Sequence, residues 1–213
     1  MKGLLLKDWY MILKYGKFYL VFHLLYAVIA AFSGRSMIVF VLMNVILGSM
    51  IVKTLMAYEE QNKWDNLVIN LPVTVREIVV EKYLMGFGGA MFANVVTFLA
   101  MWIVKLIFHR NVDIPLLPFF FLYIALGMLY LAFQLPVLFK YGTANGRFVY
   151  MIIIAVVAGI SGGLSSLLVE EMPGVKTMPG LTPVVVAAVF VAAAAGVMLS
   201  VKLSVFFYRK REF

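Results

Sequence analysis

Six long apolar segments, separated by short polar stretches, dominate this sequence. They cover residues 18–32, 37–57, 84–108, 116–139, 148–169 and 183–207. A helix needs about 20 mainly apolar residues to cross a bilayer, and most of these segments reach that length; the first is the shortest and contains His23. Backbone groups inside lipid must satisfy their own hydrogen bonds, and no alternating pattern suggests a β-barrel. We therefore predict an all-α integral membrane protein with six transmembrane helices in a single domain, residues 1–213.

The overall composition excludes a soluble protein. Only 13% of the 213 residues are charged and 64% are hydrophobic, whereas soluble domains carry about 25% charged residues. The net charge of +8 could suggest a nucleic-acid partner, but the basic residues lie in short stretches at the ends of the apolar segments. That distribution is typical of membrane topology, so we expect lipid and no nucleic acid. The sequence contains no cysteine, which excludes disulfides and cysteine-based metal sites.

The basic residues also predict an orientation. With both termini in the cytoplasm, fourteen of the 18 Lys and Arg residues face inwards, and four face outwards, namely Arg35, Lys105, Arg110 and Lys176. Short cytoplasmic loops carry an excess of Lys and Arg. We therefore expect a multi-pass protein of the bacterial plasma membrane with both ends in the cytoplasm. We also expect the first apolar run to stay as a span and not to be cleaved as a signal peptide.

Residues 1–16 have the pattern of an amphipathic helix. Leu5, Trp9 and Ile12 recur at i, i+4 and i+7, while Lys7 and Lys14 lie seven residues apart on another face. This spacing favours a helix that lies in the inner headgroup layer over a simple basic flank of the first span.

The stretch 58–82, between the second and third spans, is the longest polar region and holds five of the chain's ten acidic residues. Within it, Trp64, Leu67, Val68 and Leu71 fall at i, i+3, i+4 and i+7, which predicts a short amphipathic helix. We call residues 58–82 the elbow.

A second helix should begin inside the elbow. Pro72 ends the first helix, because proline lacks an amide donor and disfavours helix at the residue before it. Thr74 and Glu77 then have the spacing of a capping box, which predicts a restart. An ordinary solvated loop needs neither an apolar stripe nor a capped restart, so we predict that the cytoplasmic elbow binds a soluble partner.

The elbow and the N-terminus resemble the short bacterial permeases of the type-2 ABC transporter family. The N-terminal helix KGLLLKDWY precedes two spans, and a run of acidic and polar residues, a Leu-Pro turn and a Lys-Tyr start of the third span follow. The matching positions in the elbow are Glu60, Asn62, Trp64, Asp65, Leu71, Pro72, Val73, Thr74, Arg76, Val79, Lys82 and Tyr83. Within the family, the chain also resembles exporters of peptides such as the phenol-soluble modulins.

The resemblance implies a membrane subunit that works as a dimer, expected to be a homodimer, with two separate cytoplasmic ABC ATPase subunits. It implies that the elbow is the coupling helix that the ATPase moves. The residues expected to bind the ATPase or to set the angle of the elbow are Glu59, Glu60, Asn62, Lys63, Trp64, Asp65, Pro72 and Arg76.

Several polar residues lie inside the apolar segments. His23, Asn44, Asn94 and Gln134 are candidates to line a transport pathway, because polar groups within a membrane are costly and often functional. The alternative is that they form hydrogen bonds between helices and hold the bundle together.

Sequence motifs for enzymatic activity are lacking. No G-x-x-x-x-G-K-[ST] motif occurs, so ATP and Mg²⁺ should bind on the partner subunit, and we expect no cofactor and no catalytic residue here. The two histidines, His23 and His109, form no H-E-x-x-H pattern, and no metal site is expected. We predict the permease subunit of an ATP-driven exporter of amphipathic peptides or hydrophobic compounds. The alternative is a non-transporting membrane anchor or sensor scaffold whose elbow recruits a cytoplasmic regulatory protein.

Overall fold

The computed structural model describes residues 2–33, 37–68, 70–108, 116–145, 151, 152, 155, 159 and 183–210. Every regular element in this part of the chain is a helix. In order these are α1 (Lys2–Tyr15), α2 (Lys17–Phe32), α3 (Met37–Ser49), α4 (Ile51–Gln61), α5 (Trp64–Val68), α6 (Val75–Phe108), α7 (Leu116–Asn145) and α9 (Pro183–Arg209).

Within the described residues, four stretches are long and apolar enough to cross a membrane: Val39–Gln61, Val75–Ile107, Leu117–Ala144 and Val186–Arg209. The first of them combines α3 and α4. Helix α2 is shorter, and α1 meets it at a bend of 71°, so this pair could form a fifth span. Five of the six predicted apolar segments are therefore helical, but six spans are not established. Of the predicted span 148–169, only Met151, Ile152, Ala155 and Gly159 fall within the described residues.

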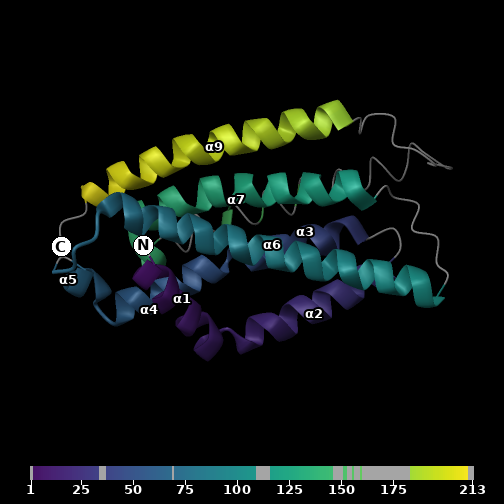
Figure 1. The fold of residues 1–213 in the computed structure, drawn as a ribbon, viewed down its shortest axis with the longest axis horizontal. Helices are drawn as coiled ribbons and strands as arrows, with labels where there is room; N and C mark the ends of the chain where they lie inside the picture. The colour runs from purple at the N-terminus through teal and green to yellow at the C-terminus, as the bar shows by residue number, and fades with distance from the viewer. Residues whose placement is uncertain are drawn as a thin grey trace.

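The helices form two groups that meet at α6. Helices α2, α3 and α6 pack against one another, and α7 and α9 lie side by side along their length (Figure 1). Helix α6 also contacts both α7 and α9. Its 34 residues give a length of about 50 Å, which exceeds the roughly 30 Å of a bilayer's hydrocarbon core. Part of α6 can therefore extend beyond the lipid and join the membrane bundle to the elbow.

Two glycines allow α3 and α6 to cross closely. A Cβ atom added at Gly89 would lie 2.3 Å from the Gly48 carbonyl oxygen, and one at Gly48 would lie 2.4 Å from the Gly89 carbonyl oxygen. Ala93, four residues after Gly89, is fully buried in the same contact region. The small-residue spacing in α6 thus serves packing within the chain.

The elbow and both termini lie at one end of the molecule (Figure 1). At this end, apolar side chains of α1, α4, α5, α6, α7 and α9 form a common core, which consists of Leu4, Val52, Met56, Val68, Ile78, Val79, Tyr83, Leu131, Leu135, Leu138, Phe139 and Tyr208. Any displacement of the elbow must therefore disturb contacts with several membrane helices.

Candidate coupling site at the elbow

The elbow has the two helices that the sequence predicts, with one difference in packing. Helix α5 ends at Val68, whose side chain is buried, but Leu67 and Leu71 are 58% and 42% exposed. The predicted apolar stripe is therefore not buried as one face. Leu67 and Leu71 point away from the core, although their helical spacing matches that of Trp64 and Val68.

The restart at Thr74 is confirmed by its hydrogen bonds. The Thr74 amide donates to Glu77 Oε2 at 2.9 Å, and the Glu77 amide donates to Thr74 Oγ1 at 3.3 Å. This reciprocal pair is a capping box, which satisfies two amides at the start of α6. The turn between α4 and α5 is also tight, because Lys63 adopts a φ of 52°, in the left-handed region.

Five ionisable side chains from three helices meet at the base of the elbow. We call Lys7 and Asp8 of α1, Glu59 of α4, and Glu81 and Lys82 of α6 the ion cluster. Lys82 Nζ lies 2.7 Å from Asp8 Oδ2, 2.6 Å from Glu59 Oε1 and 3.3 Å from Glu81 Oε2. Lys7 pairs with both Glu59 and Asp8.

The ion cluster is largely shielded from water. Asp8, Glu81 and Lys82 are 0%, 1% and 2% exposed, and the side chain of Glu59 is 11% exposed. Buried charges are costly unless they are paired, and removing one partner leaves the others uncompensated. The cluster therefore favours one arrangement in which α1, α4 and α6 stay together.

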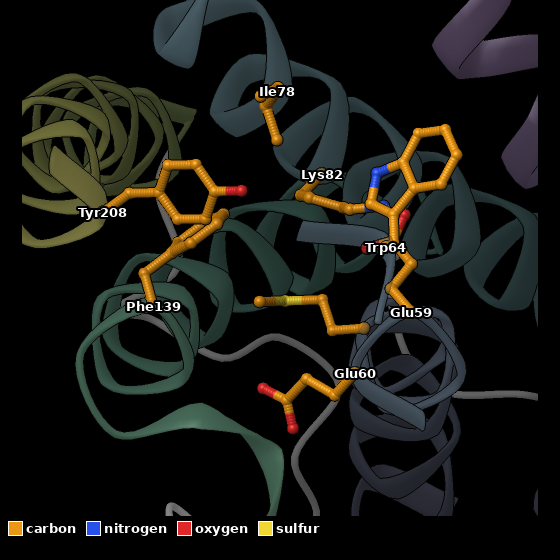
Figure 2. A pocket seen from close by; sticks show the side chains of 8 residues that line it. Glu59, Glu60, Trp64, Ile78, Lys82, Phe139 and Tyr208 are labelled. Atoms are coloured by element: carbon orange, nitrogen blue, oxygen red, sulfur yellow. The ribbon is translucent and has the colours of Figure 1, made fainter. Parts of the chain in front are cut away.

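Trp64 connects α5 to the same cluster. Lys7 Nζ lies 4.1 Å from the centre of the Trp64 ring, within range of a cation–π interaction. Figure 2 shows Trp64 beside Lys82, with Phe139 and Tyr208 across a pocket. The pocket is partly open, and about 310 Å³ of space within its bounds is not filled by protein atoms. Its walls come from α4, α5, α6, α7 and α9, so it lies where the elbow meets both helix groups.

Glu60 extends the contacts of the elbow to α7. Its two carboxylate oxygens each accept a hydrogen bond from the Thr143 amide at 3.0 Å, and the Thr143 hydroxyl also donates to it. Thr143 follows Gly142, where the helical backbone is interrupted by a φ of 73° and a ψ of 177°. A carboxylate stabilises the free amides at the start of a helical turn. Glu60 thus binds to α7 at the point where the helical hydrogen bonds of α7 are interrupted.

The predicted coupling residues divide into two groups. Glu59, Glu60 and Trp64 contact other helices of the chain, as described above. Asn62, Lys63, Pro72 and Arg76 are exposed. The backbone of Asp65 lies in α5, but its side chain is outside what the structure describes. Sequence reasoning missed the role of Asp8 and Glu81; a usable signal was that Asp8 is the only acidic residue in the first 58 positions.

The four polar residues proposed to line a pathway lie in three different environments. His23 Nδ1 and Asn44 Oδ1 are 2.6 Å apart, and Asn44 Nδ2 donates to Thr97 Oγ1 at 2.6 Å. Asn94 donates to the carbonyl of Phe120 at 3.1 Å. These bonds join α2 to α3, α3 to α6, and α6 to α7.

Gln134 differs from these residues. It is 1% exposed, and neither its Nε2 nor its Oε1 has a hydrogen-bond partner within the described part of the chain. No group of three or more His, Asp or Glu side chains suited to a metal ion occurs there either.

Comparison with known proteins identifies the family. No curated protein matches the chain, but a family model described as "ABC-2 family transporter protein" matches residues 3–209. The match covers the elbow and every helix described here, except Lys2 at the start of α1. The chain therefore belongs to the ABC-2 family of transporter membrane proteins.

Proposed function

We propose that this chain is the permease subunit of an ATP-driven exporter in the bacterial plasma membrane, with both termini in the cytoplasm. Family membership supports a permease that associates with an ABC ATPase. The observation that carries the proposal is the ion cluster, because it joins the elbow to α1 and α6 through paired charges largely shielded from water. A scaffold that only recruits a protein does not require its recruiting loop to be bonded to several membrane helices.

Force applied to the elbow would pass directly into the bundle. Glu59 lies near the end of α4 and Lys82 lies near the start of α6, so their ion pair closes the base of the elbow. In this mechanism, ATP binding draws the ATPase subunits together and displaces the exposed tip at Asn62 and Lys63. The helices on both sides of the elbow then move together, and access to the pathway alternates between the two sides of the membrane.

The other components of the transporter, the ATPase subunits and a second permease copy, are separate chains. We propose that ATP and Mg²⁺ bind to the ATPase, since this sequence has no P-loop motif, and that this chain is not itself an enzyme. A second permease copy would pair through exposed apolar side chains of α2 or α9, such as Phe18 and Val191, which are 77% and 67% exposed. The proposed cargo, amphipathic peptides or hydrophobic compounds, follows from the resemblance to peptide exporters.

Reversing the charge at the tip of the elbow tests the proposal. Lys63→Glu should lower permease-dependent stimulation of the partner ATPase at least severalfold, because Lys63 is exposed and its side chain forms no ion pair within the described part of the chain. The assay uses the copurified ATPase and the full-length permease in lipid nanodiscs. Arg209→Glu, an equal charge change at the exposed end of α9, serves as the control. Equal stimulation by the wild type and by Lys63→Glu would contradict the tip assignment, and an ATPase indifferent to the permease would favour the scaffold.

A further inference from the structure

Helix α7 is interrupted twice near its cytoplasmic end. Pro136 has no amide hydrogen, so the carbonyl of Ala132, four residues earlier, loses its usual helical donor. Six residues later, Gly142 has a φ of 73° and a ψ of 177°, a conformation that is nearly exclusive to glycine. The short segment 137–141 lies between these two interruptions, and helical bonding is weakened on both sides of it.

Ser200 of α9 supplies the hydrogen-bond donor that Pro136 cannot offer to the Ala132 carbonyl. Ser200 Oγ donates to the Ala132 carbonyl at 2.6 Å and lies 2.5 Å from Tyr83 Oη of α6. A serine hydroxyl has one hydrogen, and here it is used on Ala132, so Tyr83 must donate to Ser200. The Tyr83 hydrogen is then used as well, and Ser204, at 2.9 Å, donates to Tyr83. The resulting chain of hydrogen bonds runs from Ser204 of α9 to Tyr83 of α6 and then to Ser200 of α9. It ends at the Ala132 carbonyl of α7.

The second interruption is held from the elbow. Glu60 accepts hydrogen bonds from the Thr143 amide and hydroxyl, directly after Gly142. Glu60 and Tyr83 each directly follow a member of one ion pair in the sequence. Glu60 follows Glu59 and Tyr83 follows Lys82, and Glu59 and Lys82 form the ion pair at the base of the elbow. Glu60, which bonds to α7 directly, and Tyr83, which acts through Ser200, are therefore the sequence neighbours of that ion pair.

We propose that residues 137–141 of α7 form a hinged segment whose two hinges, Pro136 and Gly142, are held by Tyr83, through Ser200, and by Glu60. Displacement of the elbow then moves the cytoplasmic end of α7 as well as α6. In this scheme Glu60, Tyr83 and Ser200 are positioning residues. The direction of transmission, from ATPase to α7, rests on the proposed function; the existence of the hinged segment does not.

Hydrogen–deuterium exchange of the full-length permease in nanodiscs tests the hinged segment. Removing either bond, with Ser200→Ala or Glu60→Ala, should speed amide exchange across residues 137–145 about five- to tenfold, the effect of one lost hydrogen bond on a local opening. Exchange across 117–131 should not change. Ser49→Ala is the matched control, because this buried hydroxyl bonds only to the Val45 carbonyl of its own helix in the described structure.

The outcomes separate the hinge from general unfolding and from the proposed function. Unchanged exchange across 137–145 in both variants would overturn the hinge, as would equal acceleration throughout 117–145. The same measurement with the ATPase and a non-hydrolysable ATP analogue bound should alter exchange at 137–145 in the wild type. An ATPase that binds and leaves that segment unchanged would contradict transmission to α7. An ATPase that does not bind would contradict the proposed function, while the exchange rates of the free permease still decide the hinge.

Discussion

Replacing Lys82 with methionine should destabilise the permease by about 3–5 kcal/mol, the cost of removing one partner from a buried ion pair. The methionine keeps much of the side-chain volume but removes the ammonium group that lies within 3 Å of both Asp8 and Glu59. Asp8 and Glu59 would then remain largely shielded from water, beside the buried Glu81, with only Lys7 to balance them. Denaturation of the purified protein in detergent, followed by circular dichroism, measures the change.

Two further variants separate charge pairing from general damage. Lys63→Met removes an exposed ammonium group and should change stability by no more than about 0.5 kcal/mol. Adding Asp8→Asn to Lys82→Met removes one of the uncompensated carboxylates, so the double variant should be more stable than Lys82→Met alone. If Lys82→Met were as stable as the wild type, the ion cluster could not hold α1, α4 and α6 together.

Neighbouring glycines in α6 should respond in opposite directions to the same substitution. Gly89→Ala should destabilise the protein by about 1–3 kcal/mol, because the added Cβ would meet the backbone of α3. The nearest atom, the Gly48 carbonyl oxygen, is only 2.3 Å away and cannot shift without moving the helix. Gly88→Ala meets nothing within 4 Å and should stabilise the helix by up to about 1 kcal/mol through its higher helix propensity.

Thermal unfolding of the two alanine variants in the same detergent gives the comparison directly. The matched pair controls for the chemistry of the substitution, since both residues lie in one turn of α6. Equal melting temperatures would show that α3 and α6 do not cross as closely as the structure has them.

Local patterns predicted much of the architecture. The apolar segments located five helical regions, and the spacing of Thr74 and Glu77 predicted the capped start of α6. Such features depend on residues within a few positions of one another, so the sequence displays them directly. The packing of the first elbow helix was less well predicted, because the apolar character of Leu67 and Leu71 does not reveal that they stay exposed.

The contacts of the elbow could not be predicted in this way. Glu59 and Glu60 lie side by side in an acidic stretch, and both were expected to face a partner. In the structure Glu59 binds Lys82, 23 residues away, and Glu60 binds Thr143, 83 residues away. Only the packing of α4 against α6 and α7 brings these partners together. The binding of the ATPase by Asn62, Lys63 and Arg76 remains a prediction.

The same limit applies to polar residues in the spans. His23 and Asn44 were proposed for a pathway on the grounds of their polarity, yet they bond to each other across α2 and α3. Composition identifies a polar residue in an apolar segment, but it does not show whether a partner 21 positions away satisfies it. Gln134, which lacks a partner among the described residues, keeps the stronger claim to such a role.

Photocrosslinking at the tip of the elbow tests the central claim most directly. A photoreactive amino acid placed at the exposed Asn62 should, in intact cells, form a covalent adduct with a protein that contains a G-x-x-x-x-G-K-[ST] nucleotide-binding motif. The same amino acid at Val191, 67% exposed on α9, should form no such adduct. Crosslinking of Asn62 only to lipid, or only to proteins on the outer side of the plasma membrane, would contradict this claim. The elbow could then not be the site at which an ATPase acts on this permease.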